Sequence, residues 1–283
     1  MTNEQHHEND MGNDAALLQT ARRVRKMILS SIFDAQTGHA GPSLSMVEIL
    51  VTLYFSIMNH RPHEPHWDGR DRLVLSKGHG APGLYAVLCE AGYLQVSELT
   101  ELRALYSRLQ GHPNAAALPG IDFSTGSLGQ GLSVATGIAL GFKLRKKTNR
   151  VFCIVGDGEL QEGQNWEAAM SASAFDLSNL AVIVDRNRLQ GDGDTEAVMP
   201  IEPLASKFDS FGWRSISIDG HDFGQLHSSL ATTDNKPIAI IANTVKGKGV
   251  SFMENVLEWH HKPVSKPLFE QANREIDFDD NKN

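Results

Sequence analysis

The sequence predicts an α/β protein built on one parallel sheet with helices on both faces. Short apolar, β-branched runs alternate with segments of helical periodicity through residues 151–244. A chain of 283 residues with 41% hydrophobic content can bury one full core. The run Val151–Val155 leads directly into Gly156, as expected of a strand that ends at the ligand-binding edge of such a sheet.

The first half of the chain predicts mostly helices. Leu17, Ala21, Val24 and Ile28 follow a spacing of three and four residues, which indicates an amphipathic helix over 15–37. Further helices are expected over 46–58, 82–92, 97–109 and 128–147, with Ser45 as the N-cap of the first and Ser97 as the N-cap of the third. A short strand is expected at 73–75 and a loop over 110–127.

The second half alternates strands with helices. Strands are expected at 151–155, 180–185, 213–218 and 238–244, and helices at 167–174, 204–211 and 223–230. Parallel strands joined through helices require right-handed crossovers, so this order predicts a parallel sheet.

The domain organisation is predicted to be simple. Residues 1–14 are polar and are expected to form a disordered tail. Residues 15–268 are expected to form one domain, and the acidic residues 269–283 a flexible tail. No internal repeat is visible.

Composition excludes some classes of partner. A net charge of −8 argues against general affinity for nucleic acid or for an anionic membrane, because both need a basic patch. No apolar run reaches the length of a membrane span, and no secretory signal is visible. The two cysteines, Cys89 and Cys153, lie in apolar runs and are expected to be buried thiols. A cytoplasmic protein is expected.

The most informative motif is Gly156-Asp157-Gly158, with Asn187 after the next predicted strand. Glycine lets the backbone turn sharply and approach a ligand closely. Aspartate and asparagine on neighbouring strand ends offer two hard oxygen ligands. Such ligands suit Mg²⁺, which leaves its other positions to phosphate oxygens and water. The motif therefore predicts a magnesium site that holds a diphosphate.

These residues and their surroundings resemble the thiamine diphosphate-binding domain of transketolases. The resemblance runs from about residue 20 to 263, in five ordered blocks that include TGHAGPSLSMVEIL, RDRLVLSKGHG, GHPN, TGSLGQGL and KGKGVSFMEN…WHHK. It implies thiamine diphosphate and Mg²⁺ as cofactors, with Ca²⁺ or Mn²⁺ able to substitute. It also implies that the Leu189 carbonyl is a third metal ligand beside Asp157 and Asn187.

The resemblance gives roles to further residues. It implies that His79 and His260 face the diphosphate, with His261 as a rival to His260, and that His39 and His112 face the reacting oxygens. The cofactor aminopyrimidine would contact the Gly126 carbonyl and the Leu128 side chain. Glu162 and Glu167 resemble carboxylates that couple two active sites across a dimer, although a solvated helix face explains them equally well.

Two departures from the family pattern concern the site loops. The family usually has glycine after the metal-ligating asparagine, where this chain has Arg188. A bulky residue tolerates positive φ poorly, so the loop is expected to differ in shape. The family also usually reads Gly-His-Pro-Gly-Gly, where this chain has Gly38-His39-Ala40-Gly41-Pro42.

Transketolases resemble this chain only in their first portion; a second domain binds the aminopyrimidine. We therefore expect the N-terminal subunit of a split transketolase, which forms a heterotetramer with a C-terminal subunit. The assembled enzyme would transfer a two-carbon ketol unit from a ketose to an aldose. The ketose is expected to be a sugar phosphate or an analogue of one. The alternatives are a subunit of a 2-oxo acid decarboxylase or dehydrogenase, a deoxyxylulose-phosphate-synthase-like enzyme, and a cofactor-binding module without turnover.

Overall fold

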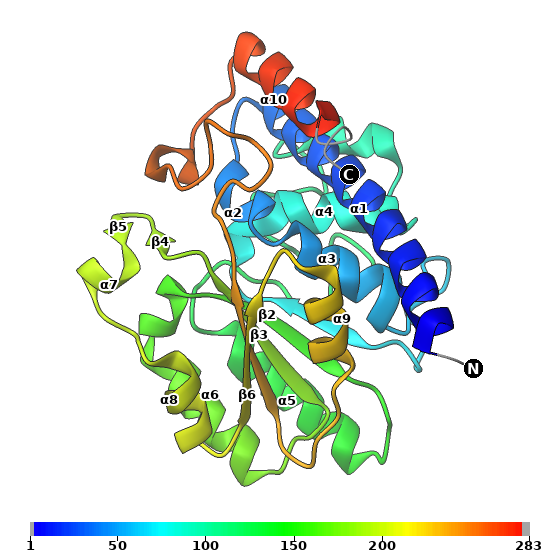
Figure 1. The fold of residues 1–283 in the computed structure, drawn as a ribbon, viewed down its shortest axis with the longest axis vertical. Helices are drawn as coiled ribbons and strands as arrows, with labels where there is room; N and C mark the ends of the chain where they lie inside the picture. Colours follow the sequence, from blue (N-terminus) through cyan, green and yellow to red (C-terminus); the bar gives the residue numbers. More distant parts are fainter. Residues whose placement is uncertain (1–2, 279–283) are drawn as a thin grey trace.

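The computed structural model describes the backbone of residues 3–278 and the side chains of residues 14–278. Its centre is a five-stranded parallel sheet in the order β1-β2-β3-β7-β6 (Figure 1). The strands are β1 (Arg72–Leu75), β2 (Val151–Gly156), β3 (Leu180–Arg186), β6 (Arg214–Asp219) and β7 (Ile238–Asn243). The predicted fold class is confirmed.

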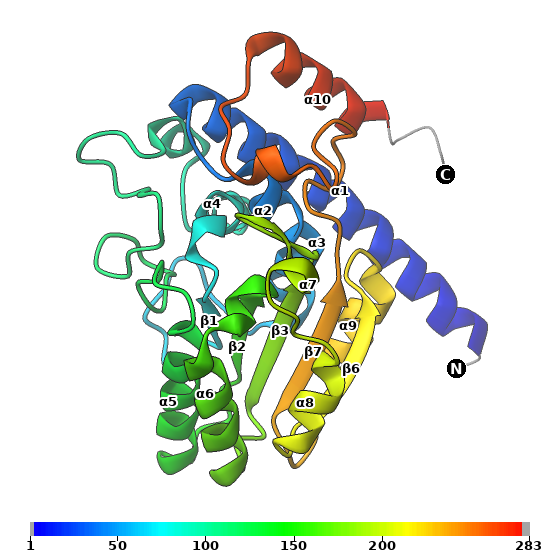
Figure 2. The same ribbon diagram turned by 90° about the vertical axis from the view of Figure 1, so that its left-hand side faces the viewer.

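Helices cover both faces of this sheet. One face packs against α1 (Asn3–Ala35), α3 (Val47–Thr52), α4 (Ala81–Glu90) and α9 (Phe223–Ala231). The other face packs against α5 (Gly131–Leu144), α6 (Gly163–Ala174) and α8 (Leu204–Ser210); in Figure 2, α5 and α6 lie side by side and α8 lies nearer β6 and β7. Alternate strand side chains point to opposite faces: Phe152 and Ile154 join the first core, whereas Cys153 and Val155 join the second.

The remaining elements are short, apart from the C-terminal helix. They are α2 (Ala40–Leu44), the π-helical turn η1 (Leu53–Ile57), the 3₁₀ turns η2 (Gly78–Gly80), η3 (Val96–Glu101), η4 (Gly158–Gln161) and η5 (Leu257–His260), the hairpin β4 (Leu189–Gln190) and β5 (Gly193–Asp194), α7 (Thr195–Val198) and α10 (Lys266–Phe278).

The two ends of the chain differ from the expectation of tails. The backbone is helical from Asn3, before the expected helix start at 15. Residues 266–278 form α10, so the prediction of a flexible segment from 269 is wrong over the described part; residues 279–283 lie outside the described residues. The reason is packing against α1: Phe269 stacks on Phe33 at 4.4 Å between ring centroids, and Ala272 and Ile276 are buried.

Two expected helix caps are wrong, and one of the two helices is much shorter than predicted. Ser45 does not cap the helix after it, because its hydroxyl donates to Asp185 at 2.6 Å and α3 begins after Met46. The helix expected at 97–109 is only the short turn η3. Its cap is Gln95, whose backbone N–H donates to the Glu98 side chain at 2.9 Å, in place of Ser97.

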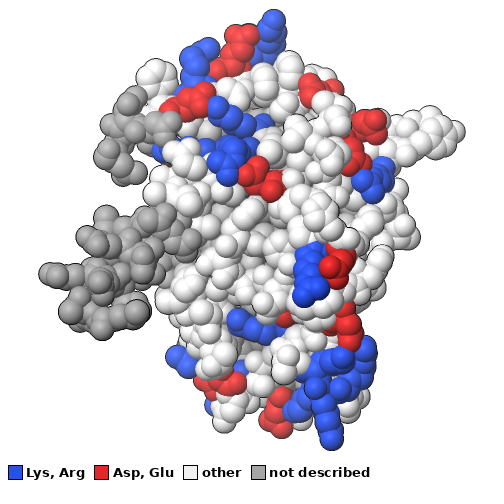
Figure 3. Space-filling view, turned by 90° about the vertical axis from the view of Figure 1, so that its right-hand side faces the viewer, with Lys and Arg blue, Asp and Glu red and all other residues white. Residues whose placement is uncertain are grey.

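The surface of the described residues agrees with the charge argument. Figure 3 shows one face, on which lysine and arginine side chains lie in small groups among aspartate and glutamate. That face carries no continuous basic stripe of the kind that tracks a nucleic acid backbone. Among the described helices, none combines the length and the apolar character that crossing a membrane requires.

Candidate active site

The carboxyl ends of the central strands open onto a cavity of about 450 Å³. Gly156 pairs in register with Asp185, and Arg186 pairs with Asn243, so residues that follow β2, β3 and β7 meet at one edge. This is the edge at which open α/β sheets bind ligands. Most of the predicted site residues line the cavity, namely His79, His112, Gly126, Leu128, Gly156, Asp157, Gly158, Glu162, Asn187, Leu189 and His260.

Two predicted residues do not line this cavity. Glu167 is exposed on α6, outside it. His39 lies just beyond the cavity wall, with its ring centroid 5.4 Å from that of His79 and 5.5 Å from that of His260. His39 therefore belongs to the same cluster of imidazoles, whereas Glu167 lies apart from it.

Asp157 is held in place by three neighbours in the surrounding loops. Its carboxylate accepts hydrogen bonds from the backbone N–H of Gly158 at 2.8 Å and of Arg188 at 2.6 Å. The fully buried Arg186 donates to it at 2.8 Å, and pairs at 2.9 Å with each of Glu196 and Glu202. Burial raises the pKa of the Asp157 carboxyl, and the hydrogen bond from Arg186 offsets only part of the rise.

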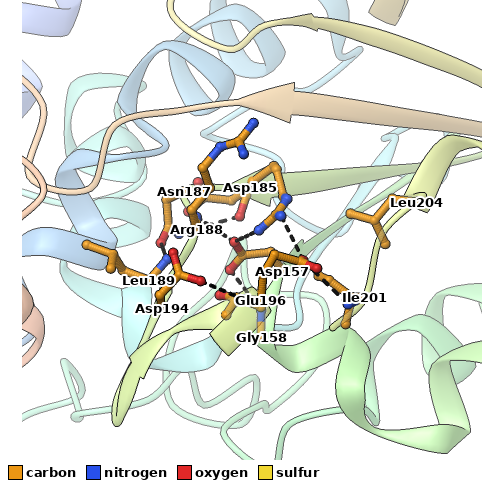
Figure 4. A network of polar contacts seen from close by, with 12 residues as sticks. Asp157, Gly158, Asp185, Asn187, Arg188, Leu189, Asp194, Glu196, Ile201 and Leu204 are labelled. Carbon is orange, nitrogen blue, oxygen red and sulfur yellow. Dashed lines mark hydrogen bonds and ion pairs between the residues drawn. The ribbon is translucent and has the colours of Figure 1, made fainter. Parts of the chain in front are cut away.

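The other two predicted metal ligands lie on the adjoining loop (Figure 4). The Asn187 side-chain oxygen accepts from the Leu189 N–H at 3.1 Å, and the Leu189 carbonyl accepts from the Lys246 ammonium at 2.9 Å. Arg188 between them adopts φ of 67°, in the left-handed region that glycine enters readily and a bulky residue rarely does. A carboxylate, an amide oxygen and a backbone carbonyl form a hard donor set that fits Mg²⁺.

Lys246, in the run VKGKG, could be read from the sequence either as an anion-steering lysine or as part of a flexible surface loop, and the structure buries it in the cavity wall. It is 1% exposed and forms no ion pair with any described carboxylate. Its ammonium donates instead to neutral acceptors, the Leu189 carbonyl and the His260 Nδ1, the latter at 2.9 Å. Burial and the charge of Lys77 lower the pKa of Lys246 to about 8. A buried ammonium with no carboxylate in direct contact favours an anionic ligand beside it.

Lys77, in the SKGHG loop, is a second lysine of the cavity. It forms a fully buried ion pair with Asp185, whose carboxylate also accepts from the hydroxyls of Ser45 and Thr244. Burial acts to raise the pKa of Asp185, but Lys77 and these hydroxyls hold it below its usual value. Nothing local in the sequence marks this pair, because its members lie 108 residues apart.

Glu159, directly after the Gly-Asp-Gly motif, was also missed. Its buried carboxylate accepts from the Ser76 hydroxyl and from the backbone N–H groups of Gly129 and Gly156, the two N–H contacts each at 2.9 Å. Ser76 follows β1, Gly129 precedes α5, and Gly156 ends β2. Glu159 therefore ties together the loops that form the cavity wall, and burial raises the pKa of its carboxyl.

The imidazoles of the cluster are neutral near pH 7. Burial, with the neighbouring histidines, lowers the pKa of His39 to about 3. Burial and Lys246 lower the pKa of His260 to about 4, and burial with Lys77 holds that of His79 well below its usual value. His261 contacts the Thr37 hydroxyl at 3.4 Å and does not line the cavity, so His260 is the member of the pair that faces it.

These pKa shifts predict a loss of stability in acid. The unfolded imidazoles bind protons near pH 6.5, whereas folded His39 stays neutral to about pH 3. The unfolded state therefore binds more protons in this window, and the free energy of unfolding falls as the pH falls through it. Asp157 and Glu159, with raised pKa values, oppose the trend. Urea unfolding at several pH values gives the free energy of unfolding as a function of pH. Between about pH 7 and pH 5 this free energy should fall less steeply for His39→Asn than for the wild type. Equal steepness would contradict the lowered pKa of His39.

Comparisons with known proteins identify the family. The family model "Transketolase, thiamine diphosphate binding domain" matches residues 17–283. The chain is 42% identical over 264 residues to "6-deoxy-6-sulfo-D-fructose transketolase subunit SqwG" of Clostridium sp. (strain MSTE9), covering 92% of this chain and 96% of that protein. It is 40% identical over 259 residues to one subunit of the apulose-4-phosphate transketolase of Phocaeicola vulgatus, covering 90% of this chain and 92% of that protein.

Longer transketolases match over a part of their length. The human transketolase is 40% identical over 274 residues, which are 96% of this chain and 44% of the human protein. The crystal structure of transketolase from Campylobacter jejuni superimposes with a TM-score of 0.88 at 33% identity, covering 94% of this chain and 43% of the other. This chain belongs to the transketolase family, in which it corresponds to the thiamine diphosphate-binding domain.

Proposed function

We propose that the chain is the diphosphate-binding subunit of a split transketolase. With Mg²⁺, thiamine diphosphate and a separate subunit that carries the pyrimidine-binding domain, it transfers a two-carbon ketol unit from a ketose to an aldose. The observation that carries the proposal is the match, over nearly their whole length, to two relatives that are named as transketolase subunits. A cavity at the carboxyl edge of the sheet, lined by the buried Lys246, whose ammonium forms no ion pair with a described carboxylate, supports it.

The residues of the cavity divide into three groups by what they can contact. Asp157, Asn187 and the Leu189 carbonyl would hold the metal. Lys77, Lys246, His79 and His260 would face the diphosphate, and Gly126 with Leu128 the aminopyrimidine. When bound, thiamine diphosphate supplies the stabilised carbanion that makes and breaks a carbon–carbon bond beside a carbonyl. His39 and His112, neutral near pH 7, can then accept a proton from a substrate hydroxyl or return one to a substrate oxygen.

The partner surface is proposed to lie over α5 and α6. Large apolar side chains are exposed there at Leu128, Leu144, Met170 and Phe175. Gly137 and Gly141 of α5 face open space, since an added Cβ would meet nothing within 4 Å. A second subunit could pack closely on such a surface, beside Glu162 and Glu167. We propose a heterotetramer and a cytoplasmic location, which suits two buried, unpaired cysteines.

The substrate is proposed to be a sugar with an anionic group at its far end. The names of the two subunit relatives include a sulfonated fructose and a phosphorylated apulose. Both substrates carry a tetrahedral oxyanion at a distance from the reacting carbonyl. The same class is proposed here, without a choice between phosphate and sulfonate.

The test is reconstitution. The purified chain, with thiamine diphosphate and Mg²⁺, should transfer no ketol unit from fructose 6-phosphate or 6-deoxy-6-sulfofructose to an aldose. Addition of a polypeptide that carries the pyrimidine-binding domain of a split transketolase should restore turnover, measured by chromatography of the product sugars. Robust transfer by the chain alone would overturn the split-site proposal. Release of CO₂ from pyruvate by the pair, without ketol transfer, would point to the decarboxylase alternative.

A further inference from the structure

The loop that connects η3 to the Gly-His-Pro segment holds an arginine in a strained conformation. Arg103 adopts φ of 60°, in the left-handed region that non-glycine residues rarely occupy, and Tyr106 adopts φ of 68°. The Arg103 N–H donates to the Leu109 carbonyl at 2.8 Å, and Arg108 anchors the loop through an ion pair with Glu98 at 2.6 Å. Strain of this kind persists only where surrounding contacts impose it, and it concentrates at functional sites.

This backbone conformation directs the Arg103 side chain toward the histidine cluster. Its guanidinium donates to the Thr37 hydroxyl at 3.1 Å. It lies against Gly111, where an added Cβ would come within 3.1 Å of the guanidinium carbon. The Thr37 hydroxyl in turn contacts His261, whose ring centroid is 4.6 Å from that of His39. Arg103 therefore stands at the outer end of a continuous row of polar side chains that begins in the cofactor cavity.

The charge of Arg103 is available to a ligand. Arg103 is exposed and forms no ion pair with any carboxylate in the described part of the chain, in contrast to Arg108 of the same loop. It lines an open cavity of about 640 Å³ together with Ser107, Gly111 and Arg108, and of these two arginines only Arg108 is paired with a described carboxylate, that of Glu98. The next residue after Gly111 is His112, which lines the cofactor cavity, so one short segment separates the two cavities. The Arg103 charge also contributes to the lowered pKa of His39 and of His112.

We propose that Arg103 binds the far anionic group of the sugar substrate, a phosphate or a sulfonate, and thereby selects charged over neutral sugars. A guanidinium presents a planar fork of donors that matches two oxygens of such a group. The sugar hydroxyls between that group and the reacting carbonyl would lie along the imidazoles. The inference rests on the proposed function and extends it, because it makes the diphosphate-binding chain itself a contributor to recognition of the far end of the substrate.

The experiment compares three sugars that differ only at carbon 6: fructose 6-phosphate, 6-deoxy-6-sulfofructose and fructose. In the reconstituted complex, Arg103→Met should raise KM for the two charged sugars about 10- to 100-fold, the range expected when a charge-assisted hydrogen bond is lost. The value of kcat should change little, and kcat/KM for fructose should stay the same. Arg103→Lys should recover part of the loss, because it restores the charge without the fork.

Two further variants test whether the effect on charged sugars is specific to the Arg103 side chain. One controls for a loss of folding stability, and the other for the loss of any positive charge from this loop. Arg103→Gly removes the strained side chain, so it should lose the same selectivity without lowering the melting temperature of the isolated chain. Arg108→Met removes the same charge from the same loop, and it should leave the ratio of charged to neutral kcat/KM unchanged. An equal effect of Arg103→Met on all three sugars, or an equal change of the ratio by Arg108→Met, would overturn the inference. Absence of ketol transfer from every sugar in the wild-type complex would instead overturn the proposed function, and the inference with it.

Discussion

Asp157→Ala should abolish metal-dependent cofactor binding in the reconstituted complex. Asp157 supplies the only charged oxygen among the three proposed ligands, and it is 2% exposed. Loss of partners outside the coordination sphere of a metal already costs about 10- to 100-fold in affinity, so loss of a ligand should cost more than about 100-fold. Calorimetric titration with thiamine diphosphate at fixed Mg²⁺ measures the effect, and ketol transfer should fall in parallel.

The matched control is Asp192→Ala. Asp192 is a carboxylate that lines the same cavity, so its removal makes the same change of charge without touching the proposed coordination. Its effect on cofactor affinity should stay within about 3-fold, the scale of a screened surface charge. Asn187→Ala should resemble Asp157→Ala, although more weakly because it removes a neutral ligand. Cofactor affinity within a few-fold of the wild type in Asp157→Ala would show that the metal binds elsewhere or not at all.

The sequence was sufficient to predict the sheet edge and the position of Asp157 at it. The runs 151–155 and 180–185 are buried on both faces, and such strands are apolar throughout, so their ends are visible without a structure. Glycine directly after the first run marks the sharp turn. The family resemblance then supplied the histidines, of which His79, His112 and His260 line the cavity.

The contacts that hold the site could not be predicted in this way. Arg186 follows the predicted strand 180–185 without any local sign of a role, yet it joins Asp157 to Glu196 in α7 and to Glu202 in the segment after α7. Ser45 has the position of a helix cap, but its hydroxyl bonds to Asp185 across the fold. Such choices depend on which groups the tertiary structure brings together, because local hydrogen bonding competes with distant partners.

The C-terminal helix α10 shows a different reason for failure. Its apolar positions Leu268, Phe269, Ala272 and Ile276 do follow helical spacing, but polar and charged residues separate them. The acidic composition of the segment predicts a flexible tail, and this prediction is wrong for residues 269–278. The helix gains its stability from one face that packs on α1, which includes the stacked pair Phe33 and Phe269. Periodicity is therefore the better guide in this segment.

The largest loss of stability is expected from Lys77→Met. The side chains of Lys77 and Asp185 are 1% and 0% exposed, so the substitution leaves a carboxylate buried with only the Ser45 and Thr244 hydroxyls as partners. Removal of one member of a buried ion pair typically costs about 3–5 kcal/mol, because the remaining charge is uncompensated. Urea unfolding of the isolated chain at about pH 7.5 should show a loss in this range.

A double variant and a surface control make this test specific. Lys77→Met combined with Asp185→Asn removes the uncompensated charge, so it should recover a substantial part of the lost stability. Lys147→Met breaks the exposed pair with Asp68, whose side chain is 57% exposed, and should change the free energy of unfolding far less, because solvent screens such a pair. A loss as small for Lys77→Met as for Lys147→Met would mean that Asp185 takes up a proton or gains solvent when its partner is removed. The pair would then serve to place the Lys77 charge in the cofactor cavity, with little contribution to folding.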